Sequence, residues 1–133
     1  MNTTLLSEHE ALLSAARDVR ENAYAPYSKF AVGAALDTGD GQVFLGCNVE
    51  NASYGLTICA ERSAVSAAIA AGYRNFDAIA IAGPDEAVTS PCGACRQVLV
   101  EFNPEMTVIF TTPHGPVVTT AAELLPHSFG PLV

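Results

Sequence analysis

Two short cysteine clusters that lie far apart in the sequence place the strongest constraint on the fold of this chain. The first is residues 59–61 (Cys-Ala-Glu) and the second is residues 91–95 (Pro-Cys-Gly-Ala-Cys). Three thiolates make an incomplete tetrahedral ligand set for zinc, and an open fourth position that holds water is typical of a catalytic zinc site. We therefore expect the two clusters to meet in space, with Cys59, Cys92 and Cys95 as the metal ligands.

The spacing within each cluster indicates how it is presented. Cys92 and Cys95 are three residues apart, so a helix that begins there carries both on one face. Cys59 and Glu61 are two apart, which would put them on opposite faces in the middle of a helix, so they can converge only at a helix end. If both helices direct their N-termini at the metal, their free N–H groups and dipoles favour the thiolate forms.

An arginine follows each cluster directly. Three thiolates on Zn²⁺ leave a net negative charge, which weakens the metal as a Lewis acid, so a cation is expected close by. Arg62 and Arg96 stand in the right places to donate hydrogen bonds to ligand sulfurs from outside the metal shell. Two solvated helix arginines are the alternative, which the small number of basic residues, 6 in all, makes less attractive.

The composition favours one compact domain over residues 1–133. Apolar residues make up 50% of the chain and charged residues 15%, a balance too apolar for a disordered segment. No apolar run reaches the ~18 residues of a membrane span, and residues 1–10 lack the basic and apolar regions of a secretion signal. We therefore expect a cytoplasmic protein with no membrane partner, whose four cysteines stay reduced and serve metal binding or catalysis.

The net charge of −8 restricts the partners. Binding to a nucleic-acid polymer requires neutralisation of phosphates, and no basic stripe occurs along the chain. A small neutral ligand is compatible with this charge. The apolar excess would leave large exposed patches on a monomer, so a subunit interface is expected.

Hydrophobic periodicity and turn residues predict the order α-β-β-α-β-α-β-β-α, which suggests a mixed sheet with helices on its faces. The segments expected to form helices are residues 7–23, 59–71, 91–102 and 120–125. The expected strands include a hairpin of residues 30–36 and 42–49, followed by residues 77–83, 106–112 and one further strand.

Three further segments carry a resemblance to a known family: residues 24–28 (YAPYS), 46–57 (GCNVENASYGLT) and 124–131 (LLPHSFGP). With the two clusters, they closely resemble the small cytidine deaminases, which use three cysteines and form homotetramers. The resemblance implies a single-domain α/β three-layer fold, with a mixed sheet of about five strands and helices on both faces. It also implies zinc-dependent hydrolysis of free cytidine and 2′-deoxycytidine to uridine and 2′-deoxyuridine with release of ammonia, in pyrimidine salvage.

The resemblance further implies a role for individual residues. Cys59, Cys92 and Cys95 would bind one Zn²⁺ per subunit, and Glu61 would shuttle protons. Active sites would be shared between subunits of the homotetramer, with Ala52 and Tyr54 reaching a neighbour's site. The substrate contacts that it implies are Phe30, Asn48, Glu50, Ala52, Tyr54, Ala60 and Phe129.

Several of these residues also have a purely structural interpretation. Asn48 and Glu50 alternate along a probable strand end and so point to one face, as a pair that holds the ribose 3′-hydroxyl would, although a polar cluster at a hairpin end looks the same. The carboxylate of Glu50 disfavours a 5′-phosphate, so a free nucleoside is expected.

Cys47 is interpreted as a small buried apolar residue. Three histidines lack metal-ligand spacing and are not assigned to the metal: His9, His114 and His127.

Two other functions fit part of the pattern. A thiol-disulfide oxidoreductase would use residues 92–95 as a redox Cys-x-x-Cys motif, but it leaves residues 59–61 unexplained. A structural zinc module would use Cys47 as a fourth ligand, but it leaves Glu61 unexplained. Among deaminases, the blasticidin type shares the zinc-ligand clusters, and base deaminases share the Glu and Pro-Cys-x-x-Cys pattern. Most base deaminases carry histidine as the first ligand.

Overall fold

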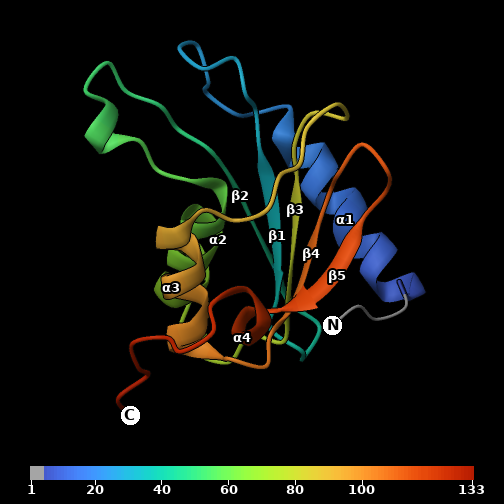
Figure 1. Cartoon of the computed structure of the whole chain (residues 1–133), viewed down its shortest axis with the longest axis vertical. Helices are drawn as coiled ribbons and strands as arrows, with labels where there is room; N and C mark the ends of the chain where they lie inside the picture. The colour runs from blue at the N-terminus through green and yellow to red at the C-terminus, as the bar shows by residue number, and fades with distance from the viewer. Residues whose placement is uncertain (1–4) are drawn as a thin grey trace.

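The computed structural model describes residues 5–133 and folds into three layers (Figure 1). The helices of the described chain are α1 (Ser7–Arg20), α2 (Ala60–Ala70), α3 (Gly93–Phe102) and α4 (Ala121–Leu124), with a short 3-10 helix at Tyr54–Leu56. The strands are β1 (Gly33–Asp37), β2 (Val43–Cys47), β3 (Ala78–Ala82), β4 (Thr107–Phe110) and β5 (Val117–Thr120). No helix within residues 5–133 has both the length and the apolar character needed to cross a membrane.

The five strands form one mixed sheet in the order β2-β1-β3-β4-β5. Only the β3–β4 pair is parallel, and the other three pairs are antiparallel. Strands β2, β3 and β4 therefore run in the same direction, so their carboxyl ends lie at one edge of the sheet. The mixed five-stranded sheet with helices on both faces confirms the predicted α/β three-layer fold.

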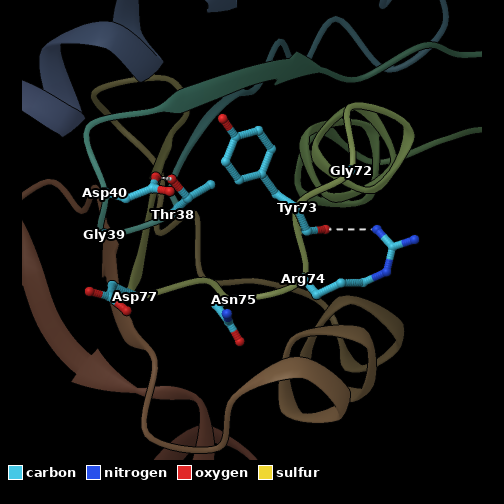
Figure 2. A pocket seen from close by; sticks show the side chains of 8 residues that line it. All are labelled: Thr38, Gly39, Asp40, Gly72, Tyr73, Arg74, Asn75 and Asp77. Carbon is cyan, nitrogen blue, oxygen red and sulfur yellow. Dashed lines mark hydrogen bonds between the residues drawn. The ribbon is translucent and has the colours of Figure 1, made fainter.

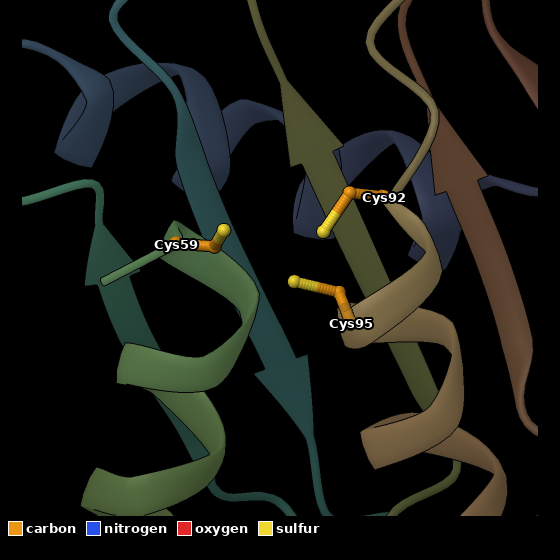
Figure 3. Close-up of side chains that lie close together, drawn as sticks. All are labelled: Cys59, Cys92 and Cys95. Carbon is orange, nitrogen blue, oxygen red and sulfur yellow. The ribbon is translucent and has the colours of Figure 1, made fainter. Parts of the chain in front are cut away.

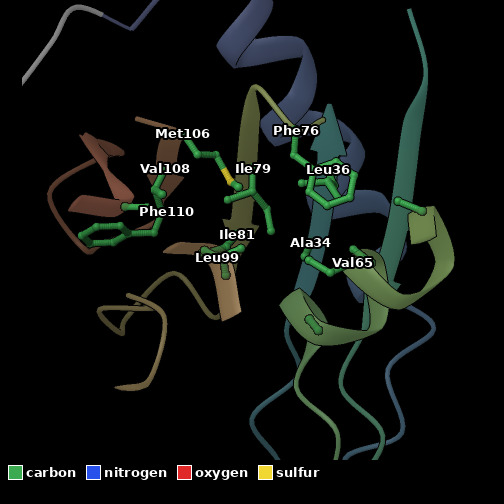
Figure 4. Packing of buried hydrophobic residues seen from close by; sticks show 14 of the residues in the cluster. Ala34, Leu36, Val65, Phe76, Ile79, Ile81, Leu99, Met106, Val108 and Phe110 are labelled. Carbon is green, nitrogen blue, oxygen red and sulfur yellow. The ribbon is translucent and has the colours of Figure 1, made fainter. Parts of the chain in front are cut away.

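The two faces of the sheet carry side chains of different size. On β3, the alanines at 78, 80 and 82 face α1, whereas Ile79 and Ile81 face α2 and α3 (Figure 4). Small side chains on one face let α1 approach the strands closely, and larger ones fill the space beneath the other helices. The alternation of alanine and isoleucine along β3 thus determines which helices pack on each face of the sheet.

The element boundaries differ from the predicted ones for local reasons. Helix α1 ends at Arg20 rather than residue 23, because the next three N–H groups donate to carbonyls three residues back and tighten the last turn. Strand β1 begins three residues later than predicted. The Asn48 side chain accepts from Val32 N at 2.9 Å and donates to Phe30 O at 2.8 Å, so an amide side chain replaces the strand ladder there.

Gly46 on β2 sets the position of α2. A Cβ at this glycine would lie 2.5 Å from both Ala60 O and Ala64 N, which are backbone atoms of the first turns of α2. The helix that follows Cys59 can therefore rest directly on the strand. Because Cys59 and Glu61 are at the start of this helix, the close approach also fixes where their side chains lie.

We predict that Gly46→Ala destabilises the fold, because the added methyl group must push α2 away from β2. Overpacking of this kind costs about 1–3 kcal/mol of the free energy of unfolding, measurable by denaturant titration at constant zinc. Gly55→Ala is the matched control, since a Cβ there meets no atom within 4 Å. Equal stability of the two variants would contradict this account of the α2–β2 contact.

Candidate metal centre and active site

The structure brings the three predicted cysteines of the two clusters together (Figure 3). The sulfur atoms of Cys59, Cys92 and Cys95 all lie within 4.8 Å of one another. Cys59 is the residue before α2, Cys92 is the residue before α3, and Cys95 is in the first turn of α3. The geometry follows from the spacing, because both clusters stand at the N-terminus of a helix.

This donor set fits a zinc ion. Three thiols that face a common point can hold one ion, and sulfur is a preferred ligand for zinc. A hydrogen bond from the Cys95 thiol is the main cause that lowers the pKa of Cys59 to about 5. The same bond, together with burial, raises the pKa of Cys95. Of the two thiols, Cys59 is therefore the more acidic, and zinc binding, which requires thiolates, would release the protons that the cluster holds.

The two arginines next to the clusters take different places. Arg62 donates to the Cys59 sulfur at 3.4 Å, so it offsets part of the negative charge of the thiolates. Arg96 departs from the prediction. Its guanidinium bonds Pro91 O at 2.7 Å, Leu124 O at 2.9 Å and Ser90 Oγ at 3.4 Å rather than a ligand sulfur.

The contacts of Arg96 stabilise the loop before Cys92 instead. Pro91 and Ser90 immediately precede Cys92, and Leu124 belongs to α4. A planar guanidinium with donors on several sides suits such carbonyl acceptors. Arg96 therefore fixes the loop that leads into the second cluster and ties it to the C-terminal part of the chain.

Glu61 is the buried acid of the site. The residue is only 5% exposed, and burial is the main cause that raises the pKa of its carboxyl group to about 7. The negative charge of Cys59 acts in the same direction. A carboxyl group that titrates near neutral pH can both accept and return a proton, which is what general acid–base catalysis requires.

A cavity of about 260 Å³ joins Glu61 to the metal cluster. Its lining residues come from four separate segments, so the cavity exists only in the folded chain. They are Phe30, Val32, Asn48, Thr57, Cys59, Ala60, Glu61, Val88, Thr89, Ser90 and Cys92. Four residues with predicted substrate or proton-transfer roles therefore share one cavity: Phe30, Asn48, Ala60 and Glu61.

Glu50 lies in a neighbouring cavity of about 370 Å³, which also includes Thr57. Its carboxylate accepts from Tyr27 N at 3.0 Å, from Ser28 N at 3.1 Å and from the Ser28 hydroxyl. The hydroxyl bond is the first of the causes that lower the pKa of Glu50. Ser28 is a residue whose role the sequence analysis missed, although it stands inside the quoted YAPYS segment.

Three predicted substrate contacts lie outside the Glu61 cavity: Ala52, Tyr54 and Phe129. Tyr54 is 75% exposed, meets the Tyr27 ring edge-on at 6.1 Å between centroids and lines the neighbouring cavity at Glu50. It belongs to the short 3-10 helix, whose segment projects beyond the sheet (Figure 1). Phe129 in the C-terminal segment is 77% exposed and is not among the residues that line either cavity. These side chains are available to another copy of the chain.

Cys47 is not part of the metal cluster. The group of potential ligands found within residues 5–133 consists of the other three cysteines, so the structural zinc alternative lacks its fourth sulfur. Cys47 is half-buried at the end of β2, more exposed than the predicted core position. The three histidines are not members of that group either.

A larger cavity of about 500 Å³ lies at the opposite end of α2 (Figure 2). Three of its polar side chains, Thr38, Asp40 and Arg74, are engaged within the fold. Arg74 donates to the carbonyl oxygens of Ile69 and Tyr73, and the Thr38 hydroxyl bonds the Asp40 carboxylate. This cavity lacks the thiols and the buried acid, so the smaller cavity at Glu61 is the chemical site.

Comparison with known proteins agrees with the geometry. The family described as the cytidine and deoxycytidylate deaminase zinc-binding region matches residues 6–111. Cytidine deaminase of Sporosarcina psychrophila is 49% identical over 122 residues, 90% of this chain and 90% of that protein. Blasticidin-S deaminase of Bacillus cereus is 35% identical over 107 residues, 74% of this chain and 76% of that protein.

Solved structures show the same fold. The crystal structure of cytidine deaminase from Burkholderia pseudomallei superposes with a TM-score of 0.86 and 58% identity, over 91% of this chain and 98% of that one. The crystal structure of cytidine deaminase from Mycobacterium tuberculosis superposes with a TM-score of 0.79 and 43% identity, over 91% of this chain and 96% of that one. The chain therefore belongs to the zinc-binding cytidine and deoxycytidylate deaminase family, and its cofactor is zinc.

The cysteine cluster leads to a prediction on metal content. Cys92→Ala leaves two thiols where three converge, so zinc per chain should fall sharply and the melting temperature should drop with it. Cys47→Ala is the matched control and should keep its zinc. Metal analysis of the purified variants checks both; loss of zinc in Cys47→Ala but not in Cys59→Ala would refute the ligand assignment.

Proposed function

We propose that the chain hydrolyses the 4-amino group of free cytidine and 2′-deoxycytidine, giving uridine or 2′-deoxyuridine and ammonia. The observation that carries the proposal is the position of Glu61, a buried acid in the same cavity as Cys59 and Cys92. Such a reaction belongs to pyrimidine salvage. The four unpaired cysteines support a cytoplasmic location, where thiols remain reduced.

Proton transfer is the task of Glu61 in this reaction. Zinc bound by Cys59, Cys92 and Cys95 would supply Lewis-acid activation of a water molecule. Glu61 accepts a proton from that water and delivers it to N3 of the pyrimidine as the water oxygen attacks C4. Glu61 would then take the proton of the new C4 hydroxyl group and pass it to the departing amine, so that ammonia leaves as the C4 carbonyl forms; its raised pKa suits both directions of transfer.

The cavity supports a pyrimidine nucleoside as substrate. In this proposal Phe30 and Ala60 contact the base, while Asn48 in the Glu61 cavity and Glu50 in the neighbouring cavity hold the sugar hydroxyl. Asn48 uses one donor and one acceptor on backbone atoms, which leaves a second amide hydrogen for a ligand.

Charge supports a free nucleoside over a nucleotide. The Glu50 carboxylate would repel a 5′-phosphate. No lysine or arginine of the described chain lines the Glu61 cavity or its neighbour. Incubation with cytidine, 2′-deoxycytidine, deoxycytidylate, cytosine and blasticidin S, followed by ultraviolet absorbance, tests this choice; turnover of deoxycytidylate but not the nucleosides would reject it.

The exposed aromatic side chains support a homotetramer with shared active sites. Tyr54 and Phe129 are more than 70% exposed. The resemblance implies that Tyr54 reaches a neighbouring site, and we propose the same for Phe129, with a tail folded over its own site as the alternative. Exposed apolar side chains also occur along the edge strand β2 and the segment after it: Val43, Leu45, Leu56 and Ile58. Such a surface is typical of a subunit interface.

Glu61→Gln should keep the fold and the zinc but lose both proton transfers. Turnover should therefore fall by at least ~10²- to 10⁴-fold, the range for one acid–base step, in a steady-state assay. Metal analysis of the same preparation serves as the control. Turnover close to that of the unmodified protein in zinc-replete Glu61→Gln would exclude this role.

Subunit mixing tests the shared site. Inactive Glu61→Ala subunits exchanged with impaired Phe129→Ala subunits should give more activity than the sum of the separate variants. The reason is that an intact Glu61 of one chain then meets an intact Phe129 of another. If native mass spectrometry confirms exchange but activity never exceeds the sum, Phe129 does not serve a neighbouring site.

A further inference from the structure

The C-terminal segment carries an exposed aromatic ring on a fixed backbone. The amide of Gln97 donates to the main-chain carbonyl of Phe129 at 2.8 Å. The Ser128 hydroxyl donates to Gly130 O at 3.0 Å, which closes a turn around Phe129. The ring itself is 77% exposed, so it is the backbone, and not packing of the ring, that holds this residue in place.

The local conformation of this turn is specific. Gly130 has φ of +79°, a region that favours glycine, and a Cβ there would lie 3.3 Å from Leu132 N. His127 also has a positive φ, +55°. Two such residues on either side of Phe129 direct the backbone so that its carbonyl meets α3 and its ring faces outward.

The anchor of this turn is the helix that carries two of the metal ligands. Gln97 is two residues after Cys95 on α3, and the neighbouring Arg96 bonds Leu124 O at 2.9 Å. The C-terminal segment is thus attached to α3 at two points, before and after residues 125–128. Figure 1 shows the segment running past α3 toward the end of the chain.

We propose that Gln97 is a positioning residue that orders the C-terminal segment and thereby presents the Phe129 ring to a substrate site in a neighbouring subunit. The inference rests on the proposed function for the identity of the substrate. Gln97 does not touch the substrate: its amide acts on a backbone carbonyl, and the ring of Phe129 makes the contact. Helix α3 then serves the metal of its own subunit and the substrate of another.

Gln97→Met tests this role, because methionine keeps the length of the side chain but has no N–H donor. Loss of one hydrogen bond should raise KM roughly two- to tenfold. The value of kcat should stay within about twofold, and zinc content and oligomer mass should not change. Glu101→Met, one turn further along α3 at an exposed position, is the matched control and should leave KM unchanged.

A double-variant cycle separates positioning from a general structural effect. In a Phe129→Ala background the ring is gone, so Gln97→Met should raise KM no further. If its effect on KM persists undiminished without the ring, Gln97 does not act through Phe129, and the proposal is wrong.

A second measurement does not depend on the reaction. The chain contains no tryptophan, so Phe129→Trp introduces a single fluorophore into the segment. Gln97→Met in this background should lower the fluorescence anisotropy of the indole, because the segment loses its anchor, whereas Glu101→Met should not. Unchanged anisotropy would overturn the proposal even in an active enzyme. Lowered anisotropy in a protein that does not deaminate cytidine would uphold the anchor and reject the proposed function alone.

Discussion

The site depends on the approach of two helix N-termini to one point at the carboxyl edge of the sheet. Cys59 and Cys92 directly precede α2 and α3. A loop from the carboxyl end of β2 leads to α2, and a loop from the carboxyl end of β3 leads to α3. The free N–H groups of both helices favour thiolates there. Close packing of α2 on Gly46 and the Arg96 contacts to Pro91 and Leu124 keep the two ends together.

The same arrangement gives Glu61 its chemistry. Its place in the first turn of α2 puts the carboxyl group beside the sulfurs but beneath the surface, so burial and the Cys59 charge both raise its pKa. In contrast, Glu50 is only half-buried and accepts hydrogen bonds from Ser28 and Tyr27, which lower its pKa. Glu61 is therefore suited to proton transfer. Glu50 favours the ionised form, which can accept a hydrogen bond from a neutral hydroxyl group.

The sequence predicts the fold and the metal cluster well because both depend on local rules. Alternation on β3 defines two faces, and the spacing of Cys59 and Glu61 requires a helix end. Contacts between a side chain and a distant backbone could not be predicted in this way. The Gln97 bond to Phe129 joins residues 32 apart through a main-chain carbonyl, which carries no residue-type signal. Arg96 bonds carbonyls for the same reason, where spacing alone suggested a sulfur.

The loops that complete the cavity depend on such long-range bonds as well. Asn48 holds the backbone of Phe30 and Val32, and Glu50 holds the turn at Ser28, so residues expected to bind the sugar also shape the segment that carries Phe30. Binding and architecture are therefore joined in the same side chains. Substitution of either side chain would therefore alter the loop as well as any contact with the sugar.

The most direct test of the account is the fate of cytidine in ¹⁸O-labelled water. Protein with about one zinc per chain should form uridine and ammonia in equal amounts, with one ¹⁸O atom at position 4 of the pyrimidine. Removal of the zinc should stop the reaction, and its return should restore it. Cytidine that stays unchanged with the zinc-replete protein, or uridine without the label, would contradict hydrolytic deamination at the Cys59–Cys92–Cys95 centre.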